Sequence, residues 1–133
     1  MERVFKHPQI FADLLDFIQL YYPLHNNLPK PFRFAVGERI LAEGAECLRA
    51  IVLANAADKA TAAGLAEGAA QVRRVRASVE VMRGFLLLAW NLKFLSHGGL
   101  TALSTCLESI SKQGARWEQW FEGKAGGALG ANG

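Results

Sequence analysis

The sequence predicts an all-α protein, an antiparallel four-helix bundle. Long segments carry apolar residues at spacings of three and four, the repeat of amphipathic helices packed around one core. Short breaks rich in proline, asparagine or glycine separate these segments, and no stretch alternates apolar and polar residues as a strand would. A chain of 133 residues suits a single core. We therefore expect one bundle domain over residues 1–122.

The composition favours a folded, associating protein. Hydrophobic residues make up 51% of the chain and charged residues 20%, which argues against disorder. The longest apolar run, residues 85–90, is much shorter than the roughly 20 residues that a membrane span needs. Residues 1–8 lack the apolar segment of a secretory signal. We expect a cytoplasmic protein that does not contact a membrane.

The first helix is expected from Ile10 to Leu24. Pro8 can stand before or within its first turn, where a missing N–H costs nothing. Asp13 and Asp16 fall off its apolar side, and the prolines and asparagines of residues 25–31 predict a loop. The apolar side consists of Ile10, Leu14, Phe17, Ile18, Tyr21 and Leu24.

The second helix is expected from about Phe32 to about Ala56. Gly37 and Gly44 weaken an isolated helix, so their presence indicates a close approach to another helix. The break at residues 55–59 ends it, and Asp58 is the expected N-cap of the next helix. Its apolar face consists of Val36, Ile40, Leu41, Ala45, Leu48, Ile51 and Val52.

The third helix is expected from about Lys59 to Leu95. Its second half, residues 85–95, is apolar on every face, which requires burial in the bundle core and against a neighbouring subunit. Its heptad positions are Leu65, Gly68, Val72, Val75, Val79, Met82, Leu86 and Ala89.

The fourth helix is expected after Ser96, its predicted N-cap, and ends near Phe121. Residues 123–133 consist largely of glycine and alanine and cannot bury enough surface to order themselves, so we predict a flexible tail. The apolar positions of the helix are Leu100, Leu103, Leu107, Ile110, Gly114, Trp117 and Phe121.

Arginine clusters in the first half of the third helix. Residues 71–95 contain five basic residues against the single acid Glu80, while the whole chain carries only +3. Such a cluster is typical of a polyanion-binding surface, and arginine suits bidentate contact with phosphate. The alternative is that arginines of the second and third helices solvate helix surfaces and pair with Glu38, Glu46 or Glu80; these arginines are Arg39, Arg49, Arg73 and Arg76.

Enzyme and metal chemistry find little support in the sequence. Its histidines have no partner at helical spacing for a metal site, and no phosphate-binding glycine motif occurs. Cys47 and Cys106 are expected to be reduced, buried thiols. Trp117 falls on a core position, whereas Trp120 is the more exposed candidate for stacking or a subunit contact. We expect no enzyme activity, metal or cofactor.

Residues 28–40 (LPKPFRFAVGERI) resemble the segment that joins helices one and two in the accessory variability determinant proteins of diversity-generating retroelements and in related bundle proteins from intervening sequences of ribosomal RNA genes. Residues 91–96 (NLKFLS) and the fourth helix, with Leu103, Ile110, Gly114 and Trp117, are also similar, so residues 10–121 are covered. The matching residues of the first segment are Pro29, Arg33, Phe34, Gly37, Glu38, Arg39 and Ile40.

The resemblance implies a bundle protomer that assembles into a homopentameric barrel. It implies a non-enzymatic accessory factor that binds nucleic acid and the retroelement's reverse transcriptase during mutagenic retrohoming. The chain departs from that family in being less basic and richer in alanine and glycine. Five copies would still carry about +15.

We therefore expect a basic surface that holds RNA, cDNA or an acidic polymerase surface. The rival hypothesis is a bundle that mediates only protein–protein contacts. The predicted contact residues are Arg33, Arg39, Arg73, Arg74, Arg76, Arg83, Lys93, Lys112 and Arg116.

Overall fold

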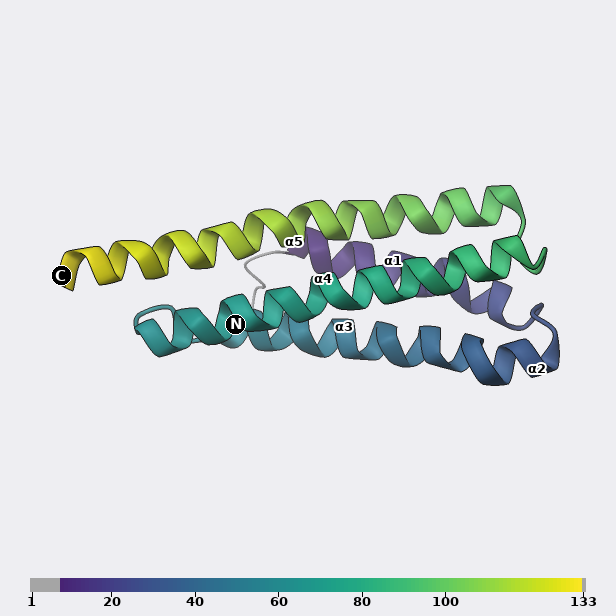
Figure 1. The fold of residues 1–133 in the computed structure, drawn as a ribbon, viewed down its shortest axis with the longest axis horizontal. Helices are drawn as coiled ribbons and strands as arrows, with labels where there is room; N and C mark the ends of the chain where they lie inside the picture. Colours follow the sequence, from purple (N-terminus) through teal and green to yellow (C-terminus); the bar gives the residue numbers. More distant parts are fainter. Residues whose placement is uncertain (1–7, 133) are drawn as a thin grey trace, which may run out of the picture.

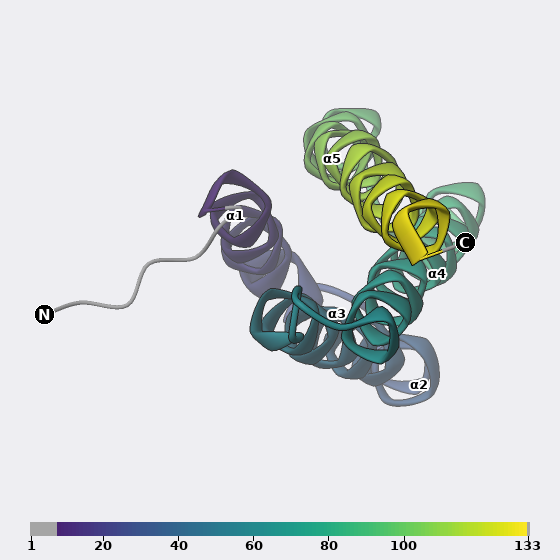
Figure 2. The ribbon, with the colours of Figure 1, turned by 90° about the vertical axis from the view of Figure 1, so that its left-hand side faces the viewer.

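The computed structural model describes residues 8–132 and is all-helical over that range. Its four long helices are α1 (Pro8–His25), α3 (Glu38–Ala56), α4 (Ala62–Asn91) and α5 (His97–Asn132), and a short helix α2 (Lys30–Phe32) and a π-helical turn η1 (Arg33–Gly37) lead into α3. Successive long helices run in opposite directions along the bundle, which is the antiparallel arrangement (Figure 1). Seen from one end they form a bundle, with α4 between α3 and α5, and α1 beside α5 (Figure 2). The predicted helical-bundle class is confirmed.

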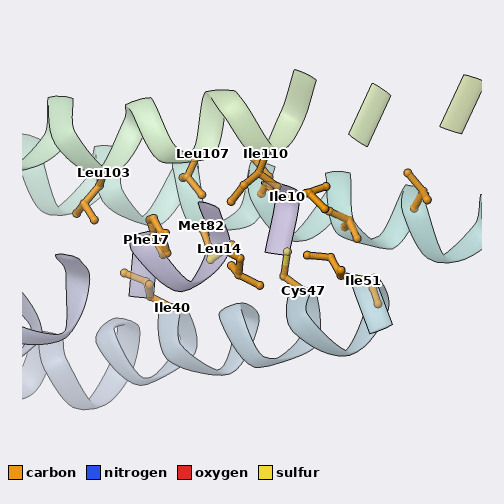
Figure 3. Packing of buried hydrophobic residues seen from close by; sticks show 14 of the residues in the cluster. Ile10, Leu14, Phe17, Ile40, Cys47, Ile51, Met82, Leu103, Leu107 and Ile110 are labelled. Atoms are coloured by element: carbon orange, nitrogen blue, oxygen red, sulfur yellow. The ribbon is translucent and has the colours of Figure 1, made fainter. Parts of the chain in front are cut away.

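The core lies where the predicted heptad positions face one another (Figure 3). Every predicted heptad residue of α4 is buried, including Gly68 and Ala89. The predicted positions of α5 from Leu103 to Phe121 are buried as well, and Trp117 is in the core as expected. The heptad spacing therefore identified the inward faces correctly, because only those faces can bury a continuous apolar stripe.

The predicted apolar side of α1 faces the core, but one of its polar residues differs from the prediction. Asp13 does not point away from the bundle but is buried, and its carboxylate accepts hydrogen bonds from three side chains. Gln9 Nε2 lies 2.7 Å from Oδ1, while Ser109 Oγ and Gln113 Nε2 lie 2.5 and 2.7 Å from Oδ2. Because α5 supplies donors at this point, a carboxylate can be buried here with its hydrogen bonds satisfied.

The second helical segment begins at Lys30, slightly earlier than expected, and contains the π-helical turn η1. Gly37 confirms the expected close approach: a Cβ there would lie 2.8 Å from His25 Cε1. Gly44 is also buried, but a Cβ there would meet Ile18 only at 3.7 Å, an ordinary contact. Of these two glycines, Gly37 is therefore the one that a larger residue could replace only after a shift of its neighbours.

The predicted start and end of the third helix were both wrong by a few residues. Helix α4 begins after Thr61, whose hydroxyl accepts from the Gly64 N–H at 3.0 Å, while Asp58 shapes the preceding turn by accepting from the Ala60 N–H at 2.9 Å. The helix ends at Asn91.

A Schellman motif closes α4, and it explains why the helix does not reach Leu95. The Phe94 N–H donates to the Ala89 carbonyl and the Lys93 N–H to the Trp90 carbonyl, at 2.8 and 2.9 Å. Lys93 has φ 67°, in the left-handed region. A helix cannot continue through a residue in that conformation.

Helix α5 begins as predicted, because Ser96 Oγ accepts from the Gly99 N–H at 3.0 Å. The prediction that the helix ends near Phe121 is wrong, since α5 continues through Asn132. Ala125 packs against the core, Lys124 Nζ lies 5.6 Å from the Trp120 ring centroid, and alanine favours helix. Those contacts and that propensity outweigh the cost of the glycines in residues 123–132. Residues 1–7 and 133 of the predicted domain and tail lie outside the described residues.

The apolar segment of residues 85–95, which contains the end of α4 and the turn after it, is covered on one side only. Leu86, Ala89 and the following Leu95 are buried, but five large apolar side chains there are between 36% and 48% exposed. They are Leu87, Leu88, Trp90, Leu92 and Phe94. Among the described residues, no helix is long and apolar enough to cross a membrane.

Candidate nucleic-acid interface

Three predicted contact residues on α4, here named the arginine row, are paired with carboxylates. They are Arg73, Arg76 and Arg83. Arg76 Nη1 lies 2.6 Å from Glu118 Oε1, and Arg73 Nη1 lies 3.3 Å from Glu118 Oε2. Because Glu118 belongs to α5, these contacts join the two longest helices of the bundle.

The other contacts of the row follow the same pattern. Arg73 Nη1 is also 3.3 Å from Glu122 Oε2, and Arg83 Nη1 is 3.7 Å from Glu108 Oε1. Arg83 Nε is 3.5 Å from Glu80 Oε1 on its own helix. The predicted alternative of paired arginines therefore holds for the row, although most of the carboxylates come from α5.

Glu118 is the centre of this network and is itself buried. Burial alone would raise the pKa of its carboxyl, but hydrogen bonds and charges from Arg76 and Arg73 outweigh burial and hold that pKa below its usual value. Gly114 leaves room for the crossing side chain, since a Cβ there would lie 3.1 Å from Arg76 Cγ. The row is thus part of the α4–α5 contact, and its charge is largely compensated.

Lys112, Arg116 and Arg74 lie apart from one another on three surfaces. Lys112 Nζ is 3.9 Å from Glu108 Oε2, beside the arginine row. Arg116 shares a shallow hollow on α5 with Trp120, which is partly exposed as expected. Arg74 lines a groove between α3 and α4 together with Arg49, which sequence reasoning did not select.

The remaining predicted residues, Arg33, Arg39 and Lys93, gather at one end of the bundle. We name this the loop end: residues 22–39 together with residues 90–99, where the α1–α2 loop and the α4–α5 turn meet, on the right in Figure 1. Arg33 Nη1 donates to the Asn26 carbonyl at 3.1 Å. Among the described residues, none of the three cations has a carboxylate within 4.0 Å.

Two long acid-free runs supply most of the loop end. Residues 17–37 and residues 81–107 contain no aspartate or glutamate, and the fold places parts of both runs at the same end. The acid at the start of α3, Glu38, lies 3.2 Å from His25 Nε2. Sequence reasoning missed this surface, although the two acid-free runs were a signal that could have revealed it.

Exposed aromatic rings stand among these cations. Phe34 is 63% exposed, and the Arg33 guanidinium carbon lies 5.4 Å from its ring centroid. Phe94 packs edge-on against Phe32, with ring centroids 5.1 Å apart, and keeps part of its surface exposed. The remaining exposed rings of the loop end are those of Tyr22 and Trp90.

A buried polar chain holds η1 against α1 beneath this surface. Tyr21 Oη lies 3.0 Å from His25 Nδ1 and 3.4 Å from the Gly37 carbonyl oxygen, to which it donates. Burial and the nearby Glu38 charge raise the pKa of the Tyr21 phenol far above its usual value, so it stays protonated. The chain fixes the backbone that carries Arg33 and Phe34.

Metal sites and reactive thiols depend on the histidine, cysteine and acidic side chains of the described residues. No group of three or more histidine, cysteine or acidic side chains that could hold a metal occurs in residues 8–132. Burial and the Glu43 charge raise the pKa of the Cys47 thiol to about 12, and burial with Asp16 and Asp13 also raises that of Cys106. Protonated thiols are poor nucleophiles.

Comparison with known proteins found no matching family model, no matching curated protein and no matching solved structure.

Proposed function

We propose that this protein is a non-enzymatic accessory subunit of a diversity-generating retroelement, which self-assembles and binds nucleic acid and the reverse transcriptase during mutagenic retrohoming. The resemblance of residues 28–40 and 91–96 supplies the biological assignment. The observation that carries the assembly is the uncovered apolar surface of α4.

Three exposed apolar side chains at the end of α4 are here named the apolar strip. Val81 and Leu88 are separated by seven residues and lie on one face of α4, and the C-cap residue Leu92 follows four residues later. They are 41%, 40% and 48% exposed. Exposed apolar surface of this kind marks an interaction site. The family that residues 28–40 resemble forms homopentamers, so the partner that we propose for this surface is a second copy of the chain.

Assembly would strengthen a modest electrostatic attraction. One protomer carries +3, whereas five would carry about +15 and present each uncompensated cation five times. Cations with no carboxylate within 4.0 Å among the described residues, such as Arg33, Arg39 and Lys93, can hold phosphate without first losing an internal partner. An acidic patch on the reverse transcriptase would be attracted by the same charges.

The mass of the protein in solution tests the assembly. We expect a pentamer by light scattering or native mass spectrometry, and we expect Leu88→Glu to shift it to smaller species, since a charge in the strip would be buried on assembly. Leu20→Glu, which changes an equally exposed leucine on α1, is the matched control and should leave the mass unchanged. A monomeric wild-type protein would rule out the barrel.

Salt dependence tests the nucleic-acid contact. Affinity for a structured RNA should fall steeply between about 50 mM and about 200 mM salt, because phosphate contacts release counterions. An affinity that stays flat over this range, or no binding at all, would contradict the proposal.

The second candidate function is a scaffold that binds only proteins. It is favoured by the arginine row, whose charges are already compensated by Glu108, Glu118 and Glu122. A pull-down of reverse transcriptase that survives nuclease treatment, from a protein with no affinity for RNA, would favour the scaffold. Loss of the pull-down on nuclease treatment would favour the accessory factor.

A further inference from the structure

We infer that nucleic acid binds as a single strand at the loop end of the bundle, with its bases stacked on exposed aromatic rings, and that the arginine row is not its binding site. This inference rests on the proposed function and specifies where and how that function acts. It combines the charges, the rings and the backbone of the loop end.

The first step concerns charge. The arginine row faces carboxylates at 2.6 to 3.7 Å, so a phosphate that binds there must displace an existing ion pair. At the loop end, Arg33, Arg39 and Lys93 face no such competitor among the described residues, and Glu38 is engaged by His25. A negatively charged backbone therefore meets uncompensated positive charge at the loop end but not along the arginine row.

The second step concerns the rings. Phe34 is the most exposed large apolar side chain among the described residues, and it lies on a π-helical turn beside a guanidinium. Trp90, with its ring centroid 6.3 Å from that of His97, and Phe94 extend the aromatic surface on the α4–α5 side. Unpaired bases stack on such rings, whereas a duplex keeps its base faces covered.

The third step concerns Lys93. It adopts φ 67° at the position after the helix cap where glycine is strongly preferred, so a lysine there has a conformational cost. A residue in a costly backbone conformation is a reason to look for function. Here the lysine adds a cation next to Phe94, in a stretch that contains no acidic residue.

The test measures fluorescence anisotropy of a labelled single-stranded RNA of about 12 nucleotides, and of the same strand annealed to its complement. Wild-type protein should bind the single strand at least about fivefold more tightly than the duplex. Phe34→Ala should weaken single-strand binding about 5- to 20-fold, while Phe34→Tyr, which keeps the ring, should retain it.

The charge of the loop end is tested separately from that of α4. Arg33→Gln with Lys93→Gly should weaken binding about tenfold, whereas the charge-matched control within the arginine row, Arg73→Gln with Arg83→Gln, should change it less than about twofold. Lys93→Gly alone should also raise the urea midpoint of unfolding, because glycine relieves the left-handed backbone. Weaker binding by a more stable variant cannot be a folding defect.

Each other outcome is informative. If RNA binds but is lost only in the α4 double variant, the site inference fails and the proposed function stands. If neither RNA binds wild type at low salt, the nucleic-acid function and its site fail together. If the protein instead co-sediments with vesicles of phosphatidylcholine and phosphatidylserine and binds no RNA, the loop end is a lipid-binding surface and the inference is overturned.

Discussion

The arginine row and the loop end contain the same kinds of cation in opposite surroundings. Along the row, three carboxylates of α5 pair with three arginines of α4, so these charges stabilise the packing of the two helices. At the loop end, two acid-free runs meet and their cations stand beside exposed rings. A basic run in one helix therefore indicates a ligand site only when the neighbouring helices lack the acids to neutralise it.

Among substitutions that test the difference between the two surfaces, Glu118→Ala should have the largest effect on stability. Removing the buried carboxylate leaves Arg76 and Arg73 without their shared partner, and we expect the free energy of unfolding to fall by about 2–4 kcal/mol. Urea denaturation would measure it. Glu122→Ala, at an exposed carboxylate that contacts only Arg73, is the control and should cost less than about 1 kcal/mol. Equal losses would mean that Glu118 is no more important than a surface ion pair.

A smaller effect is expected from Gly37→Ala, under the loop end. The new Cβ would lie 2.8 Å from His25 Cε1 and would push the ring away from Tyr21 and Glu38. We expect a loss of about 1–3 kcal/mol in the free energy of unfolding. Gly44→Ala should be neutral or stabilising, because its new Cβ would lie 3.7 Å from Ile18 Cδ1, an ordinary contact. Thermal unfolding monitored by circular dichroism distinguishes the two, and a neutral Gly37→Ala would contradict the close approach.

The carboxyl of Glu118, which pairs with the arginine row, should make the stability of the protein depend on pH in the acid range. The folded-state pKa of Glu118 lies below its unfolded value of about 4.3, so its ion pairs stabilise fully above that pH, and the stabilisation disappears as pH falls through the lower folded value. We expect this part of the stability to be lost in that range. Urea denaturation from neutral to acid pH measures the loss. Glu118→Gln should lack this component, and an identical acid profile in both proteins would contradict the assignment.

The smallest effect on stability is expected at the loop end itself. Arg33→Gln removes a guanidinium bonded only to an exposed carbonyl and stacked on an exposed ring, so the free energy of unfolding should change by less than about 0.5 kcal/mol. Urea denaturation measures this change. A loss above about 1 kcal/mol would show that Arg33 is as structural as the arginine row.

Much of the fold could be predicted because helical periodicity is a local property of the sequence. The positions of Leu86 and Leu107 were assigned correctly from spacing alone. Errors arose where an interaction outside the pattern decided the outcome. Asp13 is buried because Ser109 and Gln113, about a hundred residues away, donate to it, and α5 passes Phe121 because Ala125 still packs on the core.

The candidate site was less predictable, because charge compensation is a property of pairs of helices. Arg73 and Arg33 are equivalent in the sequence as basic residues near apolar ones. Their difference depends on which residues of other segments come within a few ångströms, and Coulomb interactions at that range outweigh the local charge count.

The sequence by itself determined the all-α class, the inward faces of the helices and the apolar excess at the end of α4, since each follows from residue type at a fixed helical period. Only the tertiary structure decided which cations are compensated and which rings remain exposed. Helix packing brought Glu118 to Arg76 and left Arg33 and Lys93 at the loop end with no carboxylate within 4.0 Å among the described residues, and no periodicity encodes distances between segments so far apart in the chain.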